Sequence, residues 1–201
     1  MKVATVQFQH VAGDITANLA VVKNYVLKAA TKNVELVIFP ECCLSGYWHL
    51  RNLTREQLGK IGQNVPAGFA CTQVTELART YNITIGVGLV EQTTAGTLYN
   101  AFFVVNADGT WANHRKLHCF VSQHMDSGDS FTVLDTPSGV RLGILTCYDN
   151  NIVENVRATS LLGAQILLAP HQTGGCNSGS PDAMGLIDVD LWEGGASRYE
   201  E

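Results

Sequence analysis

Apolar residues along the first half of the chain alternate between the spacing of strands and the spacing of helices. Short segments rich in apolar residues predict strands over 3–8, 35–39 and 83–90. Apolar residues repeated every three or four positions predict helices over 14–31, 54–62 and 66–80. Asp14 stands where a side chain can cap the first of these helices. Alternating strands and helices are typical of a layered α/β fold.

The second half of the chain contains more strands. Two segments with the pattern of strands, 98–106 and 110–116, are joined by Ala107-Asp108-Gly109 and predict a hairpin. Further strands are expected over 131–136 and in the run that ends at Cys147, with a helix over 152–162, a strand over 165–169 and a weak helix beyond Pro181. Hairpins within an alternating pattern predict a mixed rather than a purely parallel sheet.

Composition narrows the class of protein. The 201 residues are 46% apolar, enough for one core, and no break in composition divides them, so a single domain over 1–201 is expected. The net charge of −5 and the scattered Lys and Arg give no footprint for nucleic acid. No apolar run is long enough for a membrane span. A small-molecule partner fits this composition best.

The six cysteines stand at irregular positions: 42, 43, 71, 119, 147 and 176. No export signal is recognisable at Met1, so we expect a cytoplasmic protein with reduced thiols rather than a disulfide framework. Neither a CxxC pair nor an HExxH sequence is present, and we expect no metal site.

Three chemically active residues stand where predicted strands end. Cys147 closes the apolar run from Arg141, Glu41 follows the strand at 35–39, and Lys116 ends the hairpin. Each has a structural alternative: a buried strand thiol, a helix cap or loop acid, and a solvated hairpin end. Their shared position at strand ends favours one catalytic cluster of Glu41, Lys116 and Cys147.

The sequences around these three residues resemble the nitrilase superfamily of carbon-nitrogen hydrolases. The matching motifs are Phe39-Pro40-Glu41, His114-Arg115-Lys116 and Thr146-Cys147-Tyr148-Asp149, supported by Tyr99-Asn100, Gly128-Asp129, Glu154 and Arg157. The resemblance extends from residue 2 to about residue 175. It implies an α-β-β-α sandwich with mixed sheets that pairs into a homodimer or a larger homo-oligomer.

The chemistry of such a cluster follows from its side chains. A free thiol has a pKa of about 8.5, so a nucleophilic cysteine needs a base or a cationic neighbour. Glu41 can take the proton from Cys147, and Lys116 can hold the developing oxyanion. By resemblance, the second oxyanion donor is the backbone N–H of Tyr148. A thioester hydrolysed by water requires no cofactor.

Other residues are expected around this cluster. Tyr47 and His171 lie on loops predicted to overhang it, and Asp149 can tie down the turn that carries the nucleophile. Many relatives have a second glutamate after the lysine, but 117–128 contains none and Gln123 is the nearest equivalent. Asn151 likewise stands where an arginine is common in the family. Gln123 can form hydrogen bonds there but supplies no negative charge.

The chain is also shorter than the family fold, which ordinarily exceeds about 250 residues. Part of the C-terminal region of that fold is therefore expected to be lacking, and an open sheet edge would follow. Either the polypeptide is a fragment, or it is a shortened member that depends on oligomerisation.

Several functions remain open at this level. Cys147-Tyr148-Asp149 resembles the amidase and carbamoylase branches, which favours an amide or carbamoyl substrate over a nitrile. A non-catalytic assembly module with the same fold is an alternative, as is a thiol redox protein in which Cys42 or Cys43 resolves Cys147. The specific substrate is not determined by the sequence.

Overall fold

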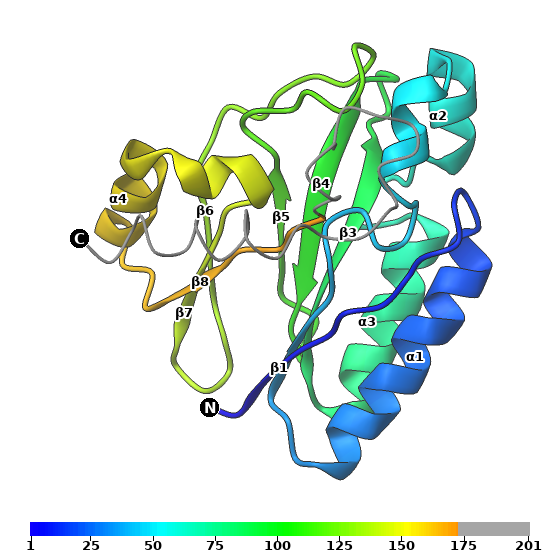
Figure 1. Cartoon of the computed structure of the whole chain (residues 1–201). Coiled ribbons are helices and arrows are strands. Elements are labelled where there is room, and N and C mark those ends of the chain that lie inside the picture. Colours follow the sequence, from blue (N-terminus) through cyan, green and yellow to red (C-terminus); the bar gives the residue numbers. More distant parts are fainter. Residues whose placement is uncertain (173–201) are drawn as a thin grey trace, which may run out of the picture. The chain divides into compact units, whose positions relative to one another are not determined.

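A five-stranded mixed sheet forms the larger half of the structure, which is a computed structural model describing residues 1–172. Its strands, in spatial order, are β1 (Val3–Thr5), β2 (Leu36–Ile38), β3 (Thr84–Gln92), β4 (Leu98–Val105) and β5 (Trp111–Arg115) (Figure 1). The first three are parallel, and β3, β4 and β5 are antiparallel neighbours. The predicted hairpin is therefore present, as β4 and β5.

A second, three-stranded sheet consists of β6 (Thr132–Asp135), β7 (Arg141–Ile144) and β8 (Ile166–Leu168). β6 and β7 are antiparallel, whereas β7 and β8 are parallel. Both sheets are thus mixed, as the alternation of strands, helices and hairpins predicts.

The helices are α1 (Ile15–Thr31), α2 (Arg55–Ile61), α3 (Phe69–Tyr81) and α4 (Val153–Leu161), with 3₁₀ turns at Trp48–Asn52 and Cys147–Asn151. The predicted cap is present, because the Asp14 carboxylate accepts a hydrogen bond from the Ala17 N–H at 2.9 Å. α1 and α3 lie side by side over the first sheet (Figure 1).

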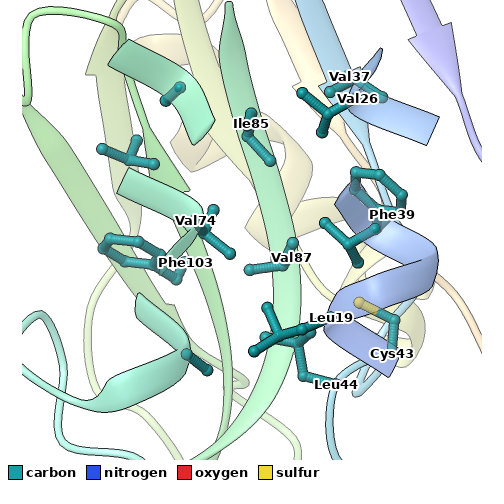
Figure 2. Close-up of a cluster of buried hydrophobic side chains, with 14 of the residues drawn as sticks. Leu19, Val26, Val37, Phe39, Cys43, Leu44, Val74, Ile85, Val87 and Phe103 are labelled. Carbon is teal, nitrogen blue, oxygen red and sulfur yellow. The ribbon is translucent and has the colours of Figure 1, made fainter. Parts of the chain in front are cut away.

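Two apolar cores hold these layers together. One lies between the first sheet and α1 and α3, and Figure 2 shows its members Leu19, Val26, Val74, Val87 and Phe103. The other lies between the two sheets and joins Leu36, Ile38, Phe102 and Val104 to Leu142, Ile144 and Leu168. Adjacent residues of β4 point to opposite faces, so Phe102 serves one core and Phe103 the other.

α4 packs on the outer side of the second sheet. A side chain at Gly143 of β7 would collide with Thr159 of α4, so the glycine lets helix and sheet approach closely. The order of layers in Met1–His171, one compact unit, is α-β-β-α.

Two predicted strands extend three residues beyond the observed ends. β1 ends at Thr5 rather than at residue 8, and β7 ends at Ile144, so Cys147 does not close a strand. Cys147 instead opens a 3₁₀ turn with a positive φ of 53°, a backbone conformation that no strand adopts. The apolar run continues past the strand because Leu145 is buried, although it lies outside the ladder.

The weak helix expected beyond Pro181 lies outside the described residues, and the single domain over 1–201 stays a prediction. Among residues 1–172, no helix combines the length and the apolar character needed to span a bilayer.

Candidate active site

Glu41 lies in a tight turn directly after β2, and its side chain is fully buried. The turn rests on Gly88 of β3: an added Cβ there would collide with the Cys42 nitrogen and lie 2.7 Å from the Glu41 carbonyl carbon. The Glu41 carboxylate accepts hydrogen bonds from Asn100 Nδ2 at 2.7 Å and from Lys116 Nζ at 2.8 Å. Buried carboxylates need such partners, which fix this one in place.

Lys116 follows β5 and is also buried, with 1% of its surface exposed. Its backbone N–H donates to the Asn100 carbonyl at 2.8 Å, and its own carbonyl accepts from the Gly128 N–H at 2.8 Å. The ammonium lies 4.9 Å from the ring centre of Phe120 and 5.9 Å from that of Tyr47. These contacts hold the cation at the end of the first sheet.

Burial alone would lower the pKa of Lys116, because the charged form loses hydration. The charges of Glu41 and Cys147 and the hydrogen bond to Glu41 outweigh burial, so the pKa is raised. The amine therefore remains an ammonium at neutral pH.

The turn that carries Cys147 is fixed by hydrogen bonds on both sides. The Cys147 N–H donates to the Pro170 carbonyl at 2.9 Å. Asn150 Nδ2 donates to the Cys147 carbonyl at 3.1 Å and to the Leu145 carbonyl at 2.7 Å. The cysteine itself is partly exposed, unlike Glu41 and Lys116.

The Cys147 pKa is raised to about 11, chiefly by burial and then by the negative charge of Glu41 and a hydrogen bond to that carboxylate. Lys116 and a backbone hydrogen bond from Tyr148 act in the opposite direction. At neutral pH the resting group is therefore a thiol rather than a thiolate. A thiol in this state attacks a carbonyl carbon only if a base removes its proton.

Asp149 is fully buried and joins the Cys147 turn to the segment after Lys116. Its carboxylate accepts hydrogen bonds from the backbone N–H groups of Thr146, Leu117 and His118, at 3.3, 3.1 and 2.9 Å. Burial alone would raise the Asp149 pKa, but the hydrogen bond from His114 and the backbone donors lower it. The carboxylate stays charged as it holds the two segments together.

The remaining predicted site residues differ in how close they come. Tyr47 is buried beside Lys116, whereas Tyr148 is 45% exposed and packs edge-on against Phe120 with ring centres 5.8 Å apart. Gln123 is exposed on its loop, and within residues 1–172 no hydrogen bond joins it to Lys116 or Glu41. His171 is partly buried, and its Nδ1 donates to the Ala169 carbonyl at 3.1 Å.

Two residues of this region are absent from the predicted site. Asn100, an isolated polar residue within the apolar strand β4, donates to Glu41. His114 lies on β5, two positions before Lys116, and is fully buried. It points to the same inward face of the strand as Ala112. The alternation of β5 identifies this face once the strand is known.

A groove of about 410 Å³ lies elsewhere, between α1 and α3. All the residues that line it belong to these two helices, and none is a predicted site residue. Among the described residues, no three His, Cys, Asp or Glu side chains are placed to hold a metal ion.

Comparison with curated proteins identifies relatives that are described as amidases. The chain is 30% identical over 173 residues to an (R)-stereoselective amidase from Pseudomonas sp., covering 85% of this chain and 60% of that protein. It is 28% identical over 181 residues to the omega-amidase NIT2 of Homo sapiens, covering 84% and 62%. The chain thus spans about 60% of the length of these curated relatives.

The fold has solved counterparts as well. Nit3 from Saccharomyces cerevisiae, described as a member of branch 10 of the nitrilase superfamily, superposes with a TM-score of 0.75 at 26% identity. The match covers 87% of this chain and 65% of Nit3. The sequence profile named Carbon-nitrogen hydrolase matches residues 2–191. The chain therefore belongs to the carbon-nitrogen hydrolase family.

Proposed function

We propose that this chain hydrolyses the C–N bond of a small amide through a thioester on Cys147. The observation that carries the proposal is the buried Lys116–Glu41 pair, at 2.8 Å, whose two charges both act on the pKa of the Cys147 thiol. A base, a cation and a thiol brought together from three separate elements match the needs of acyl transfer. The amidases among the relatives support an amide substrate.

The first half of the reaction forms the thioester. Glu41 takes the thiol proton as Cys147 Sγ attacks the amide carbon, and the carbonyl oxygen becomes an oxyanion. Lys116 Nζ and the Tyr148 N–H donate hydrogen bonds to that oxygen. Glu41 then returns the proton to the departing nitrogen, so the C–N bond breaks and ammonia or an amine leaves.

The second half regenerates the enzyme. Glu41 removes a proton from a water molecule, which attacks the thioester carbon and passes through a second oxyanion. The acid leaves, and the proton held by Glu41 returns to Cys147 Sγ. The same carboxylate takes up and then releases a proton in each half of the reaction, which is efficient only if its position is fixed. The hydrogen bonds from Asn100 and Lys116 supply that fixed position.

Two further parts of the proposal concern substrate and assembly. A carbamoyl compound fits the same steps, and a nitrile is the alternative substrate because the triad can attack its carbon as well. We also propose a homodimer or larger homo-oligomer in the cytoplasm. Size-exclusion chromatography with light scattering tests the assembly, and a cooperatively melting monomer would contradict it.

The experiment is ammonia release from a panel of small amides, ureido acids and nitriles, with Cys147→Ala alongside. The matched control is Cys71→Ala, because Cys71 is buried in α3 and takes no part in the site. Release that vanishes only in Cys147→Ala is expected. No release from the folded protein with any member of the panel would favour the non-catalytic assembly module instead.

A further inference from the structure

We propose that His114 is a positioning residue for this reaction, acting through Asp149 to hold the Cys147 turn and the Lys116 segment in register. The inference rests on the proposed function for its effect on turnover. The contacts that carry it join both sheets and both halves of the site.

His114 lies on β5 opposite Phe102 of β4, and none of its side chain is exposed. One ring nitrogen, Nδ1, lies 3.1 Å from the Thr132 hydroxyl on β6, and the other, Nε2, lies 3.3 Å from Asp149 Oδ2. A carboxylate only accepts, so Nε2 carries the proton in this pair. Nδ1 is paired with the Thr132 hydroxyl, which can either donate or accept a hydrogen bond. The imidazole is thus oriented by the second sheet and directed at the nucleophile turn.

Asp149 passes this constraint to both halves of the site. Its Oδ2 accepts from Thr146 N–H, one residue before the nucleophile, and from Leu117 N–H, one residue after the lysine. Without the imidazole N–H, a fully buried carboxylate would keep only backbone donors. Buried charges that lose a partner are costly, so the turn would rearrange.

Such a rearrangement matters because the two segments carry opposite parts of the chemistry. Cys147 supplies the nucleophile, whereas Lys116 supplies the oxyanion donor. A displacement of about 1 Å between reacting groups can cost about 100-fold in rate. His114 touches no reacting atom in this arrangement, and its role is therefore positional.

A matched pair of substitutions tests which ring nitrogen matters. The side-chain nitrogen of Gln falls near the place of Nε2, and that of Asn near the place of Nδ1. His114→Gln therefore keeps a donor to Asp149, whereas His114→Asn keeps only the contact to Thr132. Thr132→Val is the third variant, which retains the side-chain shape but removes the hydroxyl.

The readouts are kcat, KM and the rate at which iodoacetamide alkylates Cys147, followed by mass spectrometry of the peptide that carries it. We expect His114→Asn to lower kcat by about tenfold to 100-fold with KM little changed. His114→Gln should restore most of kcat, and Thr132→Val should lower it by less than about threefold. The pH profile of alkylation should shift only in His114→Asn.

Thermal melts separate positioning from stability. Equal kcat for Asn and Gln variants with matching melting temperatures would overturn the proposal, as would equal losses of kcat and stability in both. If the wild type shows no turnover, alkylation still decides: the proposed function then fails, while an altered Cys147 profile in His114→Asn alone would support the positioning role.

Discussion

Two neighbouring cations, Arg115 and Lys116, each pair with a glutamate. The two pairs differ in whether the glutamate carboxylate can still act on a further chemical group. Arg115 donates twice to Glu91, from Nε at 2.8 Å and from Nη2 at 2.7 Å. Lys116 makes one hydrogen bond to Glu41, at 2.8 Å, and is 1% exposed whereas Arg115 is 37% exposed. Adjacent side chains on an extended segment point to opposite faces, which separates the two pairs.

In the Arg115–Glu91 pair, the hydrogen-bonding groups of the two side chains are directed mainly at each other. Glu91 uses both oxygens on the guanidinium, one of them also accepts from Asn113 at 2.9 Å, and Arg115 stacks on Tyr99. The Glu41 carboxylate instead reaches the Cys147 thiol as well as Lys116. A bidentate pair is suited to fixing a sheet edge, whereas a carboxylate that also contacts a thiol is suited to moving a proton.

Neutralising each glutamate in turn is the strongest test of the difference between the two pairs. Glu41→Gln removes the proposed base and should lower kcat by on the order of 10²–10⁴-fold. Glu91→Gln, the matched control, should change kcat by less than about threefold, because Glu91 contacts no reacting group. Ammonia release measures both. Equal losses in the two variants would contradict the distinction between the pairs.

Replacing the cations gives the next largest effect. Lys116→Met removes the proposed oxyanion donor and should lower kcat/KM by on the order of 10²–10³-fold. It also leaves Glu41 buried with one partner fewer, so the free energy of unfolding should fall by about 3–5 kcal/mol. The double variant Glu41→Gln/Lys116→Met should regain part of that stability, as urea melts would show. A double variant less stable than Lys116→Met would contradict the interpretation that the unpaired Glu41 charge destabilises the single variant.

The pH dependence of Cys147 alkylation tests how the charges of Glu41 and Lys116 act on the pKa of this thiol. Because the Cys147 pKa is raised to about 11, the alkylation rate should keep rising with pH well above 9. Glu41→Gln removes a negative charge that raises this pKa, so its profile should move to lower pH. Lys116→Met removes a charge that lowers it, so its profile should move to higher pH. Shifts in the reverse directions, followed by mass spectrometry of the Cys147 peptide, would exclude these causes.

The smallest effect is expected on the free energy of unfolding when the Arg115–Glu91 pair is broken. Arg115 is 37% exposed, so solvent screening reduces the worth of its bond to Glu91. Glu91→Gln should lower the free energy of unfolding by about 0.5–1 kcal/mol, less than Lys116→Met does. Chemical denaturation compares them. A larger loss at Glu91 would reverse the ranking of the two pairs.

Much of this arrangement could be predicted from sequence pattern. The spacing of apolar residues located the helices, including the end of α1 at Thr31, and the turn residues at 107–109 located the hairpin of β4 and β5. Local pattern suffices there because backbone geometry repeats along each element. Strand ends were less accurate, since pairing partners decide them and β2 pairs over three residues only.

Sequence pattern singles out the candidate residues of the site, but not the contacts that hold them in place. Glu41, Lys116 and Cys147 stand at element ends, whereas the positive φ of Cys147 leaves no signature in the apolar run that precedes it. The contact of His114 with Asp149 joins residues 35 positions apart, which no local pattern encodes. Gln123 is predicted from its sequence position alone, whereas its exposed place on the loop depends on how 117–128 folds back.

The central claim is that Cys147 attacks the amide and carries the acyl group. The most direct measurement is an acid quench during the first turnovers of an amide substrate, followed by mass spectrometry of the Cys147 peptide. The mechanism predicts an added acyl mass on that peptide, released as acid on further incubation, and no turnover in Cys147→Ala. Ammonia release at wild-type rate in Cys147→Ala, with no adduct on Cys147 at any quench time, would contradict it.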